Sequence, residues 1–178
     1  MTQDEGDDEY APSSVLLMLG PMHFEHAGSA DVLSVKIATP EERTESLKKS
    51  ADMIQPNSLE TLHIILKSSS VSSLFDETCL TTFSDGLRPG SETMVHVLGT
   101  EDMPVQPGDV DGIRMSLVDC GLRLSSEEAQ EGSWILTARM PSLDDFEKEE
   151  DDDDGGDCDD GGFAGQVADE VAKVDEKS

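Results

Sequence analysis

Residues 59–67 (LETLHIILK) form an apolar run of strand length, and the pattern that follows them decides the fold. After a serine-rich turn at residues 68–70, apolar side chains recur every three or four positions, which predicts a helix packed on a sheet. These side chains belong to Val71, Leu74, Phe75, Cys79, Leu80 and Phe83. Residues 93–98 (TMVHVL) then predict another strand. The order of strand, helix and strand predicts two parallel strands joined by a crossover helix.

Residues 85–90 (DGLRPG) connect this helix to the strand after it. Gly86 suits the left-handed position at the end of a helix, because glycine adopts positive φ at little cost. Pro89 and Gly90 together favour a turn. The connection therefore predicts a sharp reversal into the next strand.

Two apolar runs precede this unit. Residues 13–20 (SSVLLMLG) predict a first strand, buried on both faces as in a parallel sheet, and residues 31–38 (DVLSVKIA) predict a second. A helix follows, since Thr39 can act as its N-cap, Pro40 fits its first position and Glu42 completes a capping box. The buried stripe of this helix contains Leu47, Ala51 and Ile54, with Lys48 and Lys49 exposed.

The last part of the predicted domain closes the sheet. Residues 99–108 predict a loop, and Asp109 is the expected N-cap of a short helix that ends at Cys120. The apolar side of this helix is predicted to contain Val110, Ile113, Leu117 and Val118. Residues 122–124 and 133–139 predict a hairpin at one edge. The predicted fold class is therefore α/β, with a mostly parallel sheet.

The two ends of the chain are strongly acidic. The 178 residues carry a net charge of −28, and from residue 142 onward 16 acidic residues stand against three basic ones. Such segments cannot bury enough apolar surface to offset chain entropy, so residues 1–12 and 142–178 are predicted to be disordered, around one folded domain at 13–141. Phe163, Val167, Val171 and Val174 lie at roughly helical spacing. They predict either a transient helix or one that a partner induces.

Charge and cysteine content exclude several classes of function. An excess of carboxylates repels nucleic acid and anionic membranes, so neither is an expected partner, whereas proteins are. Cys79, Cys120 and Cys158 are odd in number and widely spaced, which favours no disulfide framework. Cys79 and Cys120 are instead expected to be small core residues. The acidic start has no signal-peptide pattern, and we expect a cytoplasmic protein, with the nucleus as an alternative.

The order of elements from residue 59 to residue 98 is that of the second half of a Rossmann-like methyltransferase. A nucleotide-like cofactor needs several glycines after the first strand and an acid at the end of the second. Residues 19–24 (LGPMHF) contain one glycine followed by proline, and residues 36–39 (KIAT) contain no acid. The predicted sheet is therefore degenerate, without a cofactor site.

Neither the histidines nor the acidic run near the end of the chain predicts a metal-binding or catalytic site. His23 and His26 could donate two metal ligands, but no third ligand is evident, and two surface histidines are expected. His63 and His96 lie in predicted neighbouring strands and are expected to be hydrogen-bonded core residues. Residues 151–160 are rich in aspartate but lack the spacing of a calcium loop. We predict no catalytic, cofactor-binding or metal-binding residue.

Three stretches carry a family resemblance. Residues 59–98, 112–124 (GIRMSLVDCGLRL) and 134–141 (WILTARMP) are similar to the N-terminal domain of anamorsins, a family of cytosolic iron-sulfur cluster assembly proteins. The resemblance covers residues 13–141 and implies a methyltransferase-like domain without a working cofactor site, followed by an acidic linker.

One departure from the anamorsin pattern limits what the resemblance implies. The family carries two groups of closely spaced cysteines that bind clusters, whereas the tail of this chain has only Cys158. The implied function is a non-catalytic interaction component of cluster assembly, with a cysteine-rich iron-sulfur protein or a diflavin reductase as partner. The alternatives are a divergent S-adenosylmethionine methyltransferase, an accessory subunit of one, and an acidic chaperone-like protein.

Overall fold

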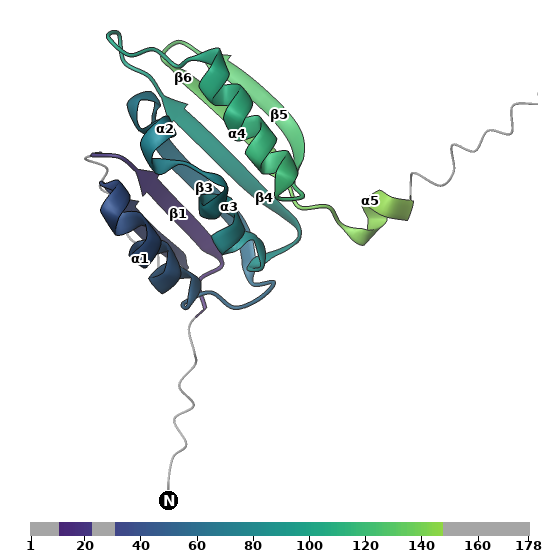
Figure 1. The fold of residues 1–178 in the computed structure, drawn as a ribbon. Helices are drawn as coiled ribbons and strands as arrows, with labels where there is room; N and C mark the ends of the chain where they lie inside the picture. The colour runs from purple at the N-terminus through teal and green to yellow at the C-terminus, as the bar shows by residue number, and fades with distance from the viewer. Residues whose placement is uncertain (1–10, 23–30, 148–178) are drawn as a thin grey trace, which may run out of the picture. The chain divides into compact units, whose positions relative to one another are not determined.

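The computed structural model describes residues 11–22 and 31–147, and its centre is a six-stranded sheet (Figure 1). The strands lie in the order β2-β1-β3-β4-β6-β5. Their bounds are β1 Ser14–Leu19, β2 Val32–Ile37, β3 Leu59–Lys67, β4 Leu87–Leu98, β5 Arg123–Gln130 and β6 Ser133–Arg139. The helices are α1 Pro40–Ala51, α2 Val71–Leu74, α3 Glu77–Ser84, α4 Pro107–Asp119 and α5 Leu143–Glu147, with a 3-10 turn at Ser68–Ser70. The chain divides into two compact units, Met1–Leu143 and Asp144–Ser178, and the sheet belongs to the first.

Most of the sheet is parallel. β1 pairs in parallel with both β2 and β3, and β3 pairs in parallel with β4. β6 runs antiparallel between β4 and β5, so the final hairpin occupies one edge as predicted. The strand order reverses between β1 and β3, and open α/β sheets bind ligands outside the carboxyl ends of the strands at such a point. The α/β fold class is confirmed, and the ends of β1 and β3 are the first place to look for a site.

The two faces of the sheet differ. Successive strand residues point to opposite faces. On one face, strand residues such as Leu17 and Ile64 join one core with buried residues from helices α1 to α4. Figure 1 shows α1, α3 and α4 on that side of the sheet. On the other face Leu16, Met18 and Ile65 form a separate cluster, to which the described residues contribute no helix.

The predicted strands of the first half are confirmed. β3 has the predicted bounds, and β1 and β2 lie inside theirs. Val15 to Leu19 are all buried, as a strand covered on both faces requires. Apolar runs therefore located β1, β2 and β3 correctly.

The single helix predicted over residues 71–83 is wrong in one respect, because the structure breaks it into α2 and α3. Phe75 and Asp76 both have extended backbone conformations. The Asp76 side chain accepts a hydrogen bond from the Thr78 N–H at 2.9 Å and so caps α3. The apolar side chains still reach the core, because Leu74 and Cys79 are both buried.

The prediction that Gly86 adopts a left-handed conformation is wrong. Among the described glycines in this segment it is Gly90 that has positive φ, at 82°. Gly86 is instead required by close packing, since a Cβ atom there would lie 2.6 Å from Cγ2 of Ile54. β4 begins at Leu87, well before the predicted strand, and the Pro89-Gly90 turn is an irregularity at the start of that strand.

Two predicted helix caps are corrected. Thr39 makes no side-chain cap bond, and Glu42 accepts from the Ala38 N–H at 3.4 Å, so the expected capping box is absent at α1. Pro40 does occupy the first turn as predicted. α4 begins at Pro107 after Gln106, which places Asp109 inside the first turn instead of at the cap.

Three further boundaries differ. Ile54 lies beyond the end of α1, and Val118 of α4 is 56% exposed, so neither belongs to a buried helical stripe. β5 continues to Gln130, six residues past the predicted strand. The predicted acidic tail starts with a short helix, α5, and residues 148–178 and 1–10 lie outside the described residues. The predicted disorder of those ends therefore stays a prediction.

Candidate functional site

The carboxyl end of β1 meets the turn after β3 at the point where strand order reverses. Gly20 has a φ of +106°, and a Cβ atom on it would lie 2.7 Å from the Ser70 hydroxyl oxygen. The Gly20 N–H donates to the Ile37 carbonyl at 2.9 Å, so the chain leaves β1 against the end of β2. Gly20 and Ser70 are therefore in close contact at the switch point.

The loop after β4 packs beside the carboxyl end of β3. Ser68, directly after β3, donates its hydroxyl hydrogen to the Met103 carbonyl at 2.8 Å. A Cβ atom on Gly99 would lie 2.9 Å from the Val105 nitrogen. The loop is held by two bonds between Thr100 and Met103, of 2.9 and 3.0 Å. These contacts place backbone, not open space, beside the end of β3.

An acid from the first turn of α1 lies beside the end of β2, which the sequence pattern did not reveal. Strand residues 36–37 supply none, but the Glu42 carboxylate from the first turn of α1 accepts from the Ala38 N–H. An acid at this strand end is the feature that holds ribose hydroxyls in nucleotide-binding sheets. Sequence reasoning treated Glu42 as a capping residue, and only the bend between β2 and α1 places it here.

A hollow of about 310 Å³ lies on the face of the sheet to which the described residues contribute no helix. Residues of β1, β2 and β3 line it: Ser14, Val15, Leu16, Val32, Thr61, His63 and Ile65. The Nε2 atom of His63 is buried and has no hydrogen-bond partner. Burial lowers the pKa of His63, and the nearby His96 lowers it further. The prediction that His63 is hydrogen-bonded is thus wrong for its Nε2 atom.

His96 lies on the same face as His63, one strand away. In the register of β3 and β4, His63 is opposite Met94 and Ile65 is opposite His96. Burial lowers the pKa of His96 as well. Both imidazoles are therefore held in the neutral form at pH 7.

The two described cysteines are core residues, as predicted. Cys79 is fully buried, and its thiol donates to the Leu74 carbonyl at 3.4 Å. Cys120 packs against the same core. Burial raises the pKa of both thiols, so neither is activated as a nucleophile.

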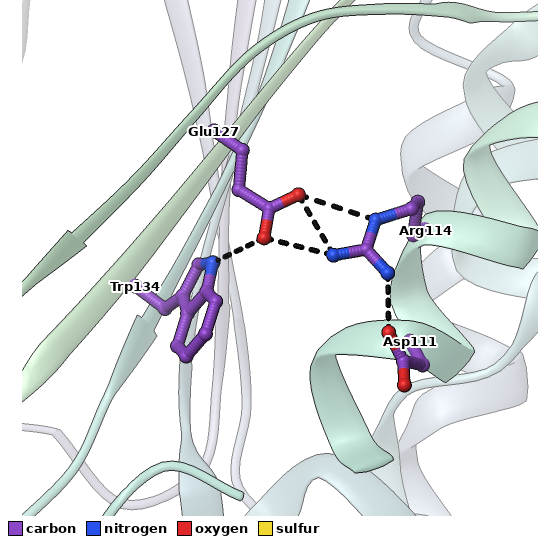
Figure 2. Close-up of polar contacts among 4 residues, drawn as sticks. All are labelled: Asp111, Arg114, Glu127 and Trp134. Atoms are coloured by element: carbon purple, nitrogen blue, oxygen red, sulfur yellow. Dashed lines mark hydrogen bonds and ion pairs between the residues drawn. The ribbon is translucent and has the colours of Figure 1, made fainter. Parts of the chain in front are cut away.

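A polar network joins α4 to the edge hairpin (Figure 2). The Arg114 guanidinium donates to both carboxylate oxygens of Glu127, at 2.8 to 3.2 Å, and also contacts Asp111. The Trp134 indole N–H donates to Glu127 Oε1 at 3.0 Å. Hydrogen bonds to the two carboxylates raise the pKa of Arg114. These side chains satisfy one another, so the network holds the hairpin on the helix.

The structure leaves other predicted candidates untested. Among residues 11–22 and 31–147, no three His, Cys, Asp or Glu side chains are grouped to hold a metal ion. His23, His26, Cys158 and residues 151–160 lie outside the described residues. In the same described part of the chain, no helix is long and apolar enough to cross a membrane.

Comparison with known proteins gives structural likeness only. No protein-family model matches the chain, and no curated protein sequence matches it. Solved structures with a similar fold include an S-adenosylmethionine-dependent methyltransferase from Aquifex aeolicus, at 12% identity, 74% coverage of this chain, 84% of that one and a TM-score of 0.43. A putative methyltransferase of the same kind from Listeria monocytogenes is 10% identical, with 75% of this chain and 93% of that chain covered and a TM-score of 0.44. An antibiotic-resistance methyltransferase is 16% identical, with 74% of this chain and 90% of that chain covered and a TM-score of 0.41.

The strand order itself defines the fold as Rossmann-like and methyltransferase-like. Four parallel strands lead to an antiparallel strand inserted before the last one, β2-β1-β3-β4-β6-β5. A fold of this class hosts many activities, so the function must be argued from the sites.

Proposed function

We propose that this chain is a non-catalytic, methyltransferase-like domain that acts by binding other proteins. The contact between Gly20 and Ser70 carries the proposal, because it occupies the switch point where the fold would hold a cofactor. The single glycine after β1 and the folded loop over Ser68 support the same conclusion. Without a cofactor, the domain has no methyl group to transfer.

The pathway is proposed from the resemblance to anamorsins. In that proposal the chain is an interaction component of cytosolic iron-sulfur cluster assembly. Cys79 and Cys120 are unsuited to bind a cluster, since both pack in the core and their thiols are not activated. The cluster would therefore belong to the partner, either a cysteine-rich protein or a diflavin reductase.

Calorimetry with S-adenosylmethionine tests the non-catalytic reading. The full chain should show no heat of binding at cofactor concentrations up to about 1 mM, far above the dissociation constants of working cofactor sites. A matched experiment uses Ser70→Gly, which removes the side chain that contacts Gly20 while leaving its backbone. Saturable binding by the unaltered chain would overturn the proposal.

Recovery of partners tests the pathway. The tagged full chain is expressed in its native cells and isolated at physiological salt, and a cysteine-rich cluster protein or a diflavin reductase should accompany it. A truncation after Pro141 separates the domain from the acidic tail. If the truncated domain loses every partner, the tail binds them and the acidic chaperone-like alternative replaces the proposal.

A divergent methyltransferase, or an accessory subunit of one, is the second candidate function. The methyltransferase-like strand order and the Glu42 carboxylate at the end of β2 favour it. If calorimetry detects cofactor binding, Glu42→Gln should weaken that binding by about tenfold, the usual effect of losing a charged hydrogen bond to a ligand. Methyltransferase subunits among the recovered partners would favour the accessory role.

A further inference from the structure

Helix α4 turns one of its faces away from the sheet. Val110, Ile113 and Leu117 are buried in the core, and α4 contacts β5, β6 and α3. Figure 1 shows the helix lying along the edge hairpin, over the opposite half of the sheet from α1. The residues on the solvent side are all exposed, and together they form the outer face of α4: Gly108, Asp111, Gly112, Met115, Val118 and Asp119.

Two large apolar side chains lie on this outer face. Met115 is 66% exposed and Val118 is 56% exposed. They are three positions apart in one helix, so they are neighbours on its surface. Contiguous exposed apolar surface with a polar rim is typical of sites that bind other proteins. The pair is therefore a candidate contact for a partner.

Two glycines leave the rest of the outer face without side chains. Gly108 and Gly112 are four positions apart, so they lie on the same side of α4. A Cβ atom on either glycine would have no atom within 4 Å apart from the helix's own backbone, so packing within the described domain does not require glycine there. Glycine inside a helix lowers its stability relative to alanine. What these glycines permit is a close approach of another backbone to α4.

The charges around the apolar pair are negative. Asp111 and Asp119 lie about one helical turn before and after Met115. Arg114, the only basic residue of α4, is already bonded to Glu127 and Asp111 (Figure 2). Asp119 is the last residue of α4, whose last turn contains no basic residue, so its carboxylate adds to the negative end of the helix dipole. A cation placed beside Asp119 is attracted by both.

These charges decide between two kinds of occupant. A second copy would bring its own Asp111 and Asp119 to the interface, together with another net charge of −28. Like charges that face each other oppose association, whereas a basic partner is attracted to the acidic chain. A helix matches the outer face best, because its side chains recur at the same three- and four-residue spacing as those of α4.

We propose that the outer face of α4 binds an amphipathic α-helix of a basic partner protein. The apolar stripe of that helix packs on Met115 and Val118, and its backbone approaches α4 over Gly112. Its Lys or Arg side chains pair with Asp111 and Asp119, which are about 12 Å apart along the axis of α4. The inference rests on the proposed function, because it names the surface and the partner chemistry that this function requires.

A designed peptide tests the outer face of α4 directly. The probe is an alanine-based helical peptide of about 18 residues, with leucines along one stripe and two lysines beside it at the spacing of Asp111 and Asp119. In a 1H–15N NMR titration of the full chain, the probe should shift the amide resonances of α4 with a dissociation constant below about 1 mM. A peptide of the same composition, with its leucines dispersed around the helix, should leave those resonances in place. The proposal is overturned if α4 shows no shifts, or if both peptides shift it equally.

Variants identify the residues that bind. Met115→Gln should weaken peptide binding about tenfold, since it replaces an apolar contact with a polar side chain of similar length. Met53→Gln is the matched control and should bind normally, because Met53 is 54% exposed just beyond α1 and lies outside the outer face. Gly112→Ala should weaken binding about fivefold while making the fold more stable, a combination that a merely structural glycine does not produce. Equal binding by these three variants would contradict the proposal.

The charge pairing has a separate readout. Asp119→Asn should weaken binding about threefold at low salt and reduce the dependence of binding on ionic strength. Asp52→Asn, at an exposed position just beyond α1, is the matched control and should leave both nearly unchanged. An identical salt response in the two variants would overturn the pairing with Asp119. Far-ultraviolet circular dichroism shows that each variant retains the fold.

Partner recovery separates this inference from the proposed function. If the Met115→Gln chain loses the partner that the unaltered chain recovers, the outer face of α4 serves that partner. If the variant keeps it, protein binding stands but occurs on another surface, and the inference fails. If the unaltered chain recovers no partner, the proposed function fails, and the peptide titration decides the inference by itself. A dimer of the unaltered chain that Met115→Gln dissociates, measured by light scattering, would assign the face to a second copy instead.

Discussion

Gly20 and Ser70 are 50 positions apart in the chain, yet a Cβ atom on Gly20 would come within 2.7 Å of the Ser70 hydroxyl oxygen. Gly20 also has a φ of +106°, a conformation that residues with a Cβ atom rarely adopt. The contact joins the ends of β1 and β3, which the fold uses as a binding crevice in ligand-binding members.

Gly20→Ala should therefore destabilise the domain by about 2 to 4 kcal/mol, from backbone strain together with the contact to Ser70. Chemical denaturation measures the change. Gly112→Ala is the matched control, because Gly112 lies inside α4 with no atom within 4 Å of a Cβ position. This variant should be about 0.5 to 1 kcal/mol more stable than the unaltered chain, since alanine favours a helix over glycine. Adding Ser70→Gly to Gly20→Ala should restore only the stability that was lost through the contact with Ser70, because the backbone strain at position 20 remains. Equal stability of the two alanine variants would show that the Gly20 contact is not tight.

The titration of His63 follows from its burial. The pKa of His63 is lowered from 6.5 in the folded chain and is near 6.5 in the unfolded chain, so the unfolded state binds more protons between these values. The free energy of unfolding should therefore fall as the pH drops from about 7 through that window. His63→Gln should show a shallower fall. NMR titration of the His63 ring protons gives its pKa directly, and a midpoint above 6.5 contradicts the prediction.

The hydrogen bond from Trp134 to Glu127 predicts a spectroscopic change. Trp134 is the only tryptophan in the chain, so its indole N–H gives one resonance. Glu127→Leu removes the acceptor, and the indole proton should move upfield and exchange with solvent about fivefold faster. Glu128→Leu is the matched control, because neighbouring residues of β5 point to opposite faces. An unmoved indole resonance in Glu127→Leu means that the bond is absent in solution.

The sequence predicted the interior of the fold better than its edges and its sites. β3 could be located because apolar side chains dominate residues 59–67, whereas residues 125–130 of β5 are polar apart from Ala129, are exposed at the sheet edge and give no such signal. The break at Asp76 was missed because an acid between Phe75 and Cys79 fits an exposed helical position equally well. The hollow depends on the register that places Leu16 beside His63, and no local pattern specifies a pairing 47 residues apart.

Gly86 provides a test of packing without backbone strain, because its φ is not positive and a Cβ atom there would lie 2.6 Å from Ile54 Cγ2 and 3.1 Å from Leu59 Cδ1. Gly86→Ala should destabilise the domain by about 1 to 3 kcal/mol through overpacking. Ile54→Ala alone should also destabilise it, since Ile54 packs against the core. The double variant should lose about 1 kcal/mol less stability than the two single losses added together, because the shortened side chain at position 54 makes room for the new methyl group. Denaturant titration of the four proteins gives this coupling, and strict additivity would show that Gly86 and Ile54 are not in contact.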